Sequence, residues 1–348
     1  MKVALCHHYS LTFHGGGERF IIDVAKQLNK RGHKAVIYSL PFSRRSIDAY
    51  HLLRGIEYYE SFIHNIDDAD IAYFIYAPLV HHLFLGECPK IGAIHSFIFL
   101  HELQHPDINS MNYLSFVRKF GFKRFLSHFY FEKIGRKNLN FFDAIHVINK
   151  EALNIFRGVK RVYYVPNWIN TSIFKPKREK NERFSVLFIG RKAKEYSLFV
   201  KIANCLKRKR IDFIAVGPDL ESIGNVKSLG LITDTEKLIE LYSQVHVMLH
   251  TSKTDVFPMS LLEASACGVP IISFPTKAIK GINLPIFYAS SVVEFTQKIC
   301  ELENIWWKER EEYIKLANRM REAVMKYDVN VVFPKFLRML KEVAEDFN

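Results

Sequence analysis

Cysteine is scarce in this sequence, and no two cysteines form a close pair. The five cysteines among 348 residues are odd in number, widely spaced and never arranged as C-x-x-C. This spacing argues against both a disulfide framework and a cysteine zinc site, and it suits a reducing compartment. We therefore expect a cytoplasmic protein.

Long hydrophobic runs are also missing. The longest candidate, IAYFIYAPLVHHLFL, is interrupted by Pro78, His81 and His82, and no run reaches the roughly 18 residues of a membrane-spanning helix. The apolar stretch in the opening MKVALCHHYS is too short for a signal-peptide core and fits a buried strand. We expect a chain that is soluble or attached only to a membrane surface.

Acidic residues are outnumbered, with 36 Asp and Glu against 49 Lys and Arg, which gives a formal net charge of +13. Such an excess favours polyanionic surroundings: nucleic acid, an anionic membrane face or phosphorylated ligands. The hydrophobic content of 49% is ordinary for a soluble globular protein, and the length favours two domains.

Short β-rich runs alternate with amphipathic helical patterns along the chain. KVALCHH is followed by the helical pattern GGGERFIIDVAKQLNKRG, and FSVLFIG is followed by one over SLFVKIANCLKRK. This alternation is typical of βαβ units in which helices cover both faces of a parallel sheet. We predict an α/β protein of two Rossmann-like, doubly wound domains facing across a cleft, with ligands beyond the carboxyl ends of the strands.

A polar, charged stretch, NTSIFKPKREKNERF, separates the two series of strands. In the second series Thr233 and Glu236 fit a capping box that would open a helix. The predicted parts are a first domain, a linker, a second domain and a C-terminal helix that would cross back to the first domain, over residues 1–166, 167–183, 184–330 and 331–348.

The segment TSKTDVFPMSLLEASACGVPII carries an acid in a loop, Asp255, and another acid eight positions later in a helix, Glu263. Two carboxylates of this kind could hold hydroxyls at two places on one ligand, and the helix N-terminus between them favours phosphate. Hydroxyl, phosphate, hydroxyl is the pattern of a nucleotide-sugar. The alternative is a structural unit in which Ser260 and Glu263 form a capping box.

Two further stretches have both a functional and a structural interpretation. In IGRKAKEY, Arg191 and Lys194 follow a predicted strand and could neutralise a diphosphate; alternatively, the stretch is a solvated basic loop. In HGGGERF, the glycines would let the backbone approach a ligand at a helix N-terminus, or would simply form a tight turn.

Taken together, these segments resemble the retaining glycosyltransferases of family 4, which have the GT-B fold. The matching pieces span roughly residues 1–275 and include GGGERFIIDVAKQLNKRGH, VPNWIN, LFIGRKAKEYSLFVKIA, FIAVGP and DVFPMSLLEASACGVPII. The resemblance implies transfer of a sugar from a nucleotide-sugar to an acceptor hydroxyl of a glycan or lipid-linked molecule. The first domain would be the acceptor side and the second the donor domain.

The resemblance also implies roles for individual residues. Asp255 would contact the donor sugar and Glu263 the ribose, while Arg191 and Lys194 would hold the diphosphate and stabilise the departing nucleotide. The remaining implied residues are Gly16 and Gly17 against the phosphates, His95 near the reacting sugar, and Phe257, Met259 and Ser260 at the donor. Cations and a helix terminus stabilise the leaving group in such enzymes, so neither a cofactor nor a metal is expected.

Four features depart from the family pattern. Asp255 replaces the usual first glutamate, Pro258 stands where glycine is common, Asn170 replaces an aspartate, and Arg191 and Lys194 are closer together than usual. The alternative function is therefore a catalytically inactive GT-B-like protein that binds an anionic membrane or nucleic acid.

The string HELQH at residues 101–105 has the H-E-x-x-H form of many zinc proteases. Such a site needs both histidines in one continuous helix, and Pro106 biases His105 away from helical angles. We do not expect zinc here; the string more simply belongs to a loop after the strand AIHSF.

Residues 113–142 interleave aromatic and basic side chains. A basic amphipathic helix with aromatics can lie at an anionic membrane interface, which would suit a lipid-linked acceptor. Alternatively, the aromatic face packs on the first sheet and the cations point to water. No recognised nucleic-acid-binding module is present, so nucleic acid is not an expected partner.

Overall fold

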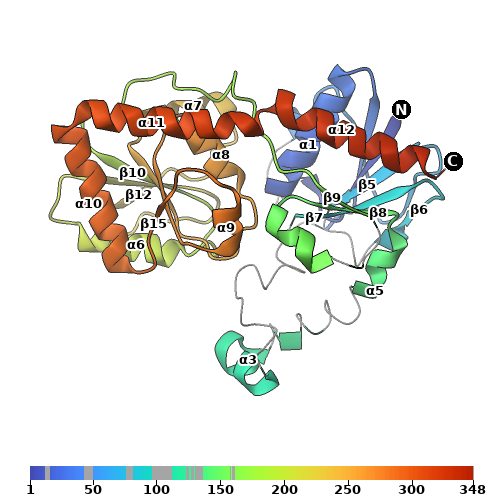
Figure 1. The fold of residues 1–348 in the computed structure, drawn as a ribbon, viewed down its shortest axis with the longest axis horizontal. Helices are drawn as coiled ribbons and strands as arrows, with labels where there is room; N and C mark the ends of the chain where they lie inside the picture. The colour runs from blue at the N-terminus through green and yellow to red at the C-terminus, as the bar shows by residue number, and fades with distance from the viewer. Residues whose placement is uncertain are drawn as a thin grey trace. The chain divides into compact units, whose positions relative to one another are not determined.

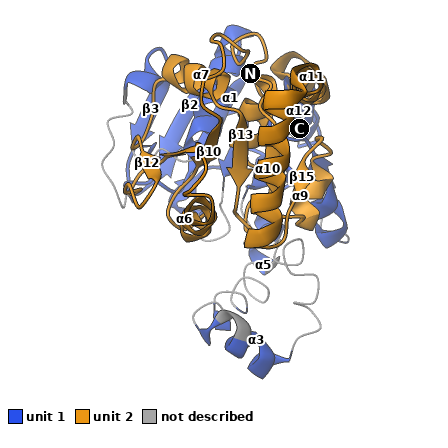
Figure 2. Ribbon diagram, turned by 90° about the vertical axis from the view of Figure 1, so that its left-hand side faces the viewer, with its two compact units in different colours: residues 1–167, 333–348 blue, residues 168–332 orange. Residues whose placement is uncertain are grey.

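The computed structural model describes residues 1–11, 16–42, 50–75, 81–95, 112–122, 125–126, 129, 136–156, 158 and 161–347. The chain divides into two compact units, Met1–Asn167 with Phe333–Asn348 and Trp168–Val332, which Figure 2 distinguishes by colour. Each unit is built on its own parallel sheet. Among the described residues, no helix combines the length and the apolar character that crossing a bilayer requires.

The first unit contains, in its described part, a seven-stranded parallel sheet. In sheet order its strands are β3 (Glu57–Glu60), β2 (Lys34–Ser39), β1 (Lys2–His7), β5 (Ile71–Ile75), β7 (Lys90–Ile94), β8 (Ala144–Val147) and β9 (Arg161–Tyr164). The strand order reverses between β1 and β5, and such a switch point is where open α/β sheets bind ligands.

The other described elements of this unit are helices, short 3-10 turns and a two-stranded ribbon. The α-helices are α1 (Gly16–Lys30), α3 (Tyr113–Phe120), α5 (Arg136–Asn138) and α12 (Val329–Glu345), of which α12 begins in the second unit. The 3-10 helices are η2 (Tyr50–Leu53), η3 (His81–Leu83), η7 (Leu139–Phe141) and η8 (Lys150–Phe156), and the ribbon is β4 (His64–Asn65) with β6 (Phe84–Leu85).

Successive residues of β5 show how the first sheet is buried on both faces. Tyr73 faces the helices, where its ring centroid lies 5.1 Å from that of Phe336 in α12. The next residue, Phe74, faces the other side and packs 5.4 Å from Phe142. The α12 and α1 helices lie side by side on the first of these faces (Figure 1), where the Phe336 ring is 6.3 Å from that of Phe20.

The second unit has a six-stranded parallel sheet among its described residues. In sheet order the strands are β12 (Val226–Ser228), β11 (Asp212–Val216), β10 (Ser185–Ile189), β13 (Val247–His250), β14 (Ile271–Ser273) and β15 (Phe287–Tyr288). Numbered along the chain, this is the 3-2-1-4-5-6 order of a dinucleotide-binding fold, with its switch point between β10 and β13. The predicted α/β, Rossmann-like fold class is confirmed.

Helices cover both faces of this second sheet. They are α6 (Tyr196–Cys205), α7 (Thr235–Gln244), α8 (Met259–Ala266), α9 (Lys277–Gly281), α10 (Val292–Lys308) and α11 (Arg310–Val324), followed by η9 (Met325–Tyr327). The α6 and α10 helices share a core with the sheet that includes Phe199 and Phe295, while α8 packs with α7 and α11 (Figure 1).

One predicted helix start differs from the structure by one residue. Asp234, and not Thr233, is the N-cap of α7, because its carboxylate accepts from the backbone N–H groups of Glu236 and Lys237. Pro258 is the N-cap of α8 and makes no side-chain cap bond.

The predicted linker is fastened to the second unit along α7. The Lys177 N–H donates to Ser243 Oγ at 2.9 Å, the Arg178 guanidinium pairs with Glu240, and Asn181 donates to the carbonyl of Gln244. These bonds give the polar stretch a fixed path over its own domain.

Candidate functional site

Two glycines contact each other at the carboxyl edge of the second sheet. Gly190 directly follows β10, and its N–H donates to Val216 O at 3.0 Å. Gly217 directly follows β11 with φ +156, and a Cβ there would lie 1.7 Å from the Gly190 carbonyl oxygen. Only glycine at position 217 allows the two backbones to approach so closely. This contact fixes the position of Gly190, from which the basic loop begins.

The basic loop, residues 191–195, is tied to the end of β13. Thr251 Oγ1 donates to the carbonyl oxygens of Lys194 and Glu195 at 2.9 and 3.3 Å. Glu195 then enters α6 with φ 61, a left-handed conformation that a residue with a Cβ adopts only when its surroundings enforce it. The loop therefore has one defined path past the switch point.

Lys194 and Asp255 meet at this edge as an ion pair between Lys194 Nζ and Asp255 Oδ1. The other carboxylate oxygen, Oδ2, accepts from His250 Nε2 at 2.9 Å. Behind it, Ser273 Oγ lies 2.9 Å from His250 Nδ1. One acid is thus held by two nitrogen donors from different parts of the unit.

The electrostatics of this group follow from its burial. Burial, and to a lesser degree the charge of Lys194, lowers the pKa of His250 to about 3, so that the imidazole is neutral. Burial, followed by the charge of Arg191, lowers the pKa of Lys194 to about 8. The Asp255 carboxylate acts in the opposite direction, because a negative neighbour favours the ammonium form.

Glu263 lies in the second turn of α8 and is buried, with 1% of its surface exposed. The Tyr242 hydroxyl of α7 donates to its Oε2 at 2.9 Å. The alternative capping box with Ser260 is not the start of this helix, because the N-cap is Pro258 and makes no side-chain cap bond. A buried acid near a helix N-terminus can accept from the hydroxyls of a ligand.

Of the remaining donor-side candidates of the second unit, three lie at the start of α8 and Arg191 lies in the basic loop. Phe257 is buried against Tyr327, with ring centroids 5.3 Å apart, and so has a packing role. Met259 and Ser260, the first residues of the helix, are partly exposed. Arg191 is also partly exposed, at the beginning of the basic loop.

The candidates in the first unit lie at the carboxyl edge of its own sheet. Gly16 and Gly17 are the first residues of α1; Gly16 is exposed and Gly17 buried. The buried acid Glu18 lies in the same first turn, its Oε1 3.6 Å from His7 Nε2. His95 directly follows β7, and its ring centroid lies 4.6 Å from that of Phe20 in α1.

Several polar residues of these edges were not predicted as site residues. In the second unit they are His250 and Tyr242, which hold the two acids; in the first unit they are Tyr73 and His146, which form a hydrogen-bonded series with His95. The only sequence signal is that each is a polar ring inside an otherwise apolar stretch.

The HELQH string lies outside the described residues, as do residues 123–124, 127–128 and 130–135 of the aromatic and basic stretch. Within the described ranges, no three His, Cys, Asp or Glu side chains gather in a way that could hold a metal ion.

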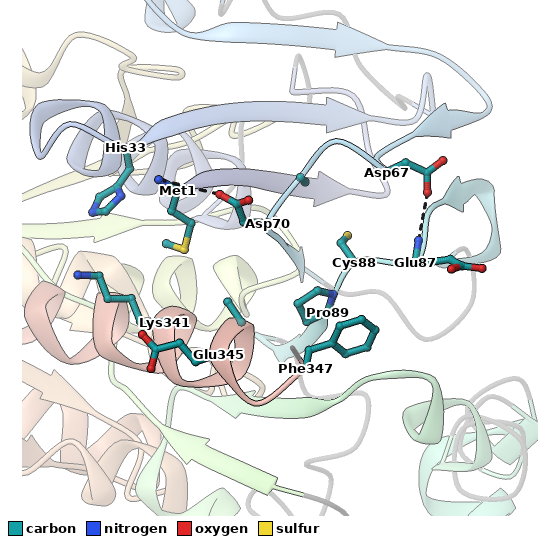
Figure 3. A pocket seen from close by; sticks show the side chains of 12 residues that line it. Met1, His33, Asp67, Asp70, Glu87, Cys88, Pro89, Lys341, Glu345 and Phe347 are labelled. Carbon is teal, nitrogen blue, oxygen red and sulfur yellow. Dashed lines mark hydrogen bonds and ion pairs between the residues drawn. The ribbon is translucent and has the colours of Figure 1, made fainter.

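A hollow of about 660 Å³ lies elsewhere on the first unit (Figure 3). Its lining includes Met1, Asp70 and Pro89, which precede β1, β5 and β7, so it lies at the amino edge of the sheet. Asp67 and Glu87 add further negative charge to the lining. This position and these charges are unsuited to a nucleoside diphosphate, and we place the candidate site at the carboxyl edges instead.

Comparison with known proteins points the same way. The family "Glycosyl transferases group 1" matches residues 183–304, which include the whole second-unit group around Asp255. The phosphatidylinositol N-acetylglucosaminyltransferase gpi3 subunit of Schizosaccharomyces pombe is 24% identical over 295 residues. That alignment covers 74% of this chain, and the chain spans only 62% of the length of this curated relative.

Solved structures share the fold across both units. Anabaena HepE, solved in complex with UDP-glucose, aligns with a TM-score of 0.72 at 14% identity, covering 98% of this chain and 99% of its own. Sucrose-phosphate synthase from Thermosynechococcus elongatus gives a TM-score of 0.70 at 14% identity, covering 98% of each chain. The resemblance predicted from the sequence is confirmed: residues 183–304 match the group 1 glycosyltransferases, and the chain has the GT-B fold of two Rossmann-like domains.

Proposed function

We propose that this protein transfers a sugar from a nucleotide-sugar to an acceptor hydroxyl, with retention of configuration and without a metal ion. One observation carries the proposal: Lys194 and Asp255 form an ion pair beside the switch point of the second sheet, within the segment that matches the family. A cation and an acid at that edge complement a diphosphate and a sugar hydroxyl.

In the proposed reaction the sugar–phosphate bond breaks while the acceptor oxygen bonds to the same sugar carbon. Negative charge develops on the departing diphosphate, and the hydroxyl proton of the acceptor neutralises part of it. Arg191 and Lys194 would stabilise this charge, and the N-terminus of α8 adds its partial positive charge. Asp255 and Glu263 would fix the sugar and the ribose through their hydroxyls.

For the donor we propose a UDP-linked hexose or N-acetylhexosamine. HepE was solved with UDP-glucose, and the name of the S. pombe relative specifies N-acetylglucosaminyl transfer to phosphatidylinositol. These names also support a lipid-linked acceptor, and the word subunit in the relative's name supports work within a larger assembly.

We further propose that the protein works in the cytoplasm, at the inner face of a membrane. Tyr113 and Leu114 at the start of α3 are 66% and 74% exposed, and Phe122 is 62% exposed. With Arg118 on the same helix, these side chains suit an anionic lipid surface. Sedimentation with phosphatidylserine vesicles, compared with phosphatidylcholine vesicles, tests this; equal recovery with both would contradict it.

The function is tested by incubating the protein and phosphatidylinositol vesicles, as the acceptor, with UDP-GlcNAc, UDP-glucose, GDP-mannose or ADP-glucose and measuring release of the nucleotide. We expect release with a UDP-sugar, with or without EDTA, and loss of release in Asp255→Ala and Glu263→Ala. Proton NMR of the product gives its anomeric configuration. Binding to anionic vesicles without affinity for any nucleotide-sugar would instead support the inactive, membrane-binding alternative.

A further inference from the structure

A series of three polar side chains runs through the first unit beneath its carboxyl edge. His95 Nε2 lies 3.0 Å from the hydroxyl of Tyr73, which lies 2.7 Å from His146 Nδ1. The other nitrogen of His146, Nε2, lies 2.7 Å from the carbonyl oxygen of Val165. Tyr73 and His146 are completely buried on β5 and β8, whereas His95, just after β7, is partly exposed.

The hydrogen bonds fix the position of every proton in this series. A carbonyl oxygen can only accept, so His146 must carry its proton on Nε2. In a neutral imidazole Nδ1 is then an acceptor, and the Tyr73 hydroxyl must donate to it. Because that hydroxyl has only one proton, its oxygen must accept from His95 Nε2–H. His95 is therefore the Nε2-protonated tautomer, with Nδ1 as an acceptor.

The surroundings keep both histidines neutral. Burial is the main cause that lowers the pKa of His95 well below its usual range. Burial lowers the pKa of His146 to about 4. Aromatic rings from two helices pack against the two histidines. The ring of Phe20 in α1 packs on His95, and the ring centroid of Phe336 in α12 lies 5.9 Å from that of His146.

The same edge carries two groups that accept hydrogen bonds. The first turn of α1 carries the buried acid Glu18, which offsets the partial positive charge of the helix N-terminus. A neutral imidazole with an acceptor nitrogen offers no hydrogen bond to a phosphate oxygen at that nitrogen and accepts one from a hydroxyl. Both observations favour a ligand group that donates a hydrogen bond.

We propose that Tyr73 and His146 are positioning residues that hold His95 in its Nε2-protonated tautomer, so that Nδ1 accepts a hydrogen bond from a sugar hydroxyl at the carboxyl edge of the first sheet. The identity of the ligand rests on the proposed function, whereas the tautomer does not. Tyr73 and His146 act through the orientation and protonation of His95 and do not touch the ligand.

Histidine-selective ¹⁵N NMR of the full chain tests the tautomer without any assay of activity. The signals of His95 are identified among the 15 histidines by their loss in His95→Asn. We expect a protonated Nε2 and an unprotonated Nδ1 for His95 at pH 7. A wild-type spectrum with the proton of His95 on Nδ1 would overturn the inference; if His95→Asn does not fold, sequential backbone and side-chain assignment of the wild type identifies the same signals.

The variant Tyr73→Phe removes the hydroxyl that links the two histidines, and we expect His95 to lose its single tautomer. The matched control is Tyr313→Phe, which also removes a buried hydroxyl, one that donates to His246 O at 2.7 Å in the second unit. The control should leave the His95 signals unchanged. An unaltered His95 tautomer in Tyr73→Phe would contradict a positioning role.

Turnover of UDP-GlcNAc separates this inference from the proposed function. We expect kcat/KM to fall roughly 10- to 100-fold in Tyr73→Phe, because a misoriented group loses its transition-state contact, and to change little in Tyr313→Phe. Equal losses in both variants would overturn the role in ligand binding while leaving the tautomer in place. No turnover by the wild type with any nucleotide-sugar would refute the proposed function, and the NMR would still decide the tautomer.

Discussion

His250 Nε2 lies 2.9 Å from Asp255 Oδ2, and this hydrogen bond holds the carboxylate oxygen that Lys194 does not contact. The pKa of His250, lowered by burial to about 3, keeps the imidazole neutral. The carboxylate can only accept, so the proton of His250 is on Nε2, and Ser273 donates to Nδ1. Asp255 is shorter by one methylene than the glutamate usual in the family, and its carboxylate contacts both Lys194 and His250.

The bond between His250 and Asp255 can be tested with two amides of different length. His250→Gln places an amide N–H near the former Nε2 and should keep the bond, whereas His250→Asn places it near Nδ1 and should lose it. A hydrogen bond to a charged group contributes about 1.5–3 kcal/mol. We therefore expect kcat/KM for UDP-GlcNAc to fall roughly 10- to 100-fold in the Asn variant and far less in the Gln variant. Equal activity in the two variants would show that this bond does not position Asp255.

The lowered pKa of Lys194 predicts a pH dependence. Its ammonium form is charged below pH about 8 and is lost as the pH rises through that value, so affinity for a diphosphate should fall above pH 8. The profile of kcat/KM reports the free enzyme, in which Arg191 and Asp255 are the charged neighbours and His250 is already neutral. Lys194→Arg stays charged across this range, and its profile should be flat between pH 7 and 10. A wild-type profile without an alkaline fall would contradict this assignment.

Glu263 is predicted to bind the nucleotide and Tyr242 only to support it. Glu263→Gln keeps the shape of the side chain but removes the charge, and the dissociation constant of UDP should rise about tenfold. Tyr242→Phe removes the donor to Glu263 and should lower the free energy of unfolding by about 1 kcal/mol, with less effect on UDP. Isothermal titration with UDP and urea unfolding separate the two effects. A larger loss of UDP affinity in Tyr242→Phe than in Glu263→Gln would reverse the two roles.

The fold was predictable because buried parallel strands are continuous apolar runs, as KVALCH in β1 and SVLFI in β10 show. The edge strand β3 was not predicted, since its sequence EYYE is charged and half-exposed. The α11 helix was also not predicted. Its buried residues, Tyr313, Met320 and Val324, are too few among charged neighbours to give a clear apolar period.

The candidate site was predictable only in part. The positions of Lys194 and Asp255 after two strands indicate one edge of the sheet, because parallel strands end together. The bond from His250 depends on how the loop turns back over β13, which no local pattern specifies. The series of Tyr73 and His146 depends on the register of β5, β7 and β8, which only the assembled sheet defines.

The contact between Gly217 and Gly190 gives the last prediction. A Cβ at position 217 would lie 1.7 Å from the Gly190 carbonyl oxygen. Neither the Cβ nor a backbone oxygen can move away by a side-chain rotation, so the backbone itself would have to shift. Gly217→Ala should therefore lower the free energy of unfolding by roughly 2–4 kcal/mol. The variant should also weaken UDP binding, because the displaced Gly190 begins the loop that carries Arg191.

Gly230→Ala is the matched control, since Gly230 also has a positive φ, +69, but a Cβ there would meet nothing within 4 Å. This control should lose only about 1–2 kcal/mol, from the left-handed backbone, and keep its affinity for UDP. Urea unfolding and UDP titration of both variants measure the difference. If the two substitutions lower the free energy of unfolding equally, the backbone contact between Gly190 and Gly217 does not hold the basic loop. The conformational preference of glycine alone would then explain the glycine at position 217.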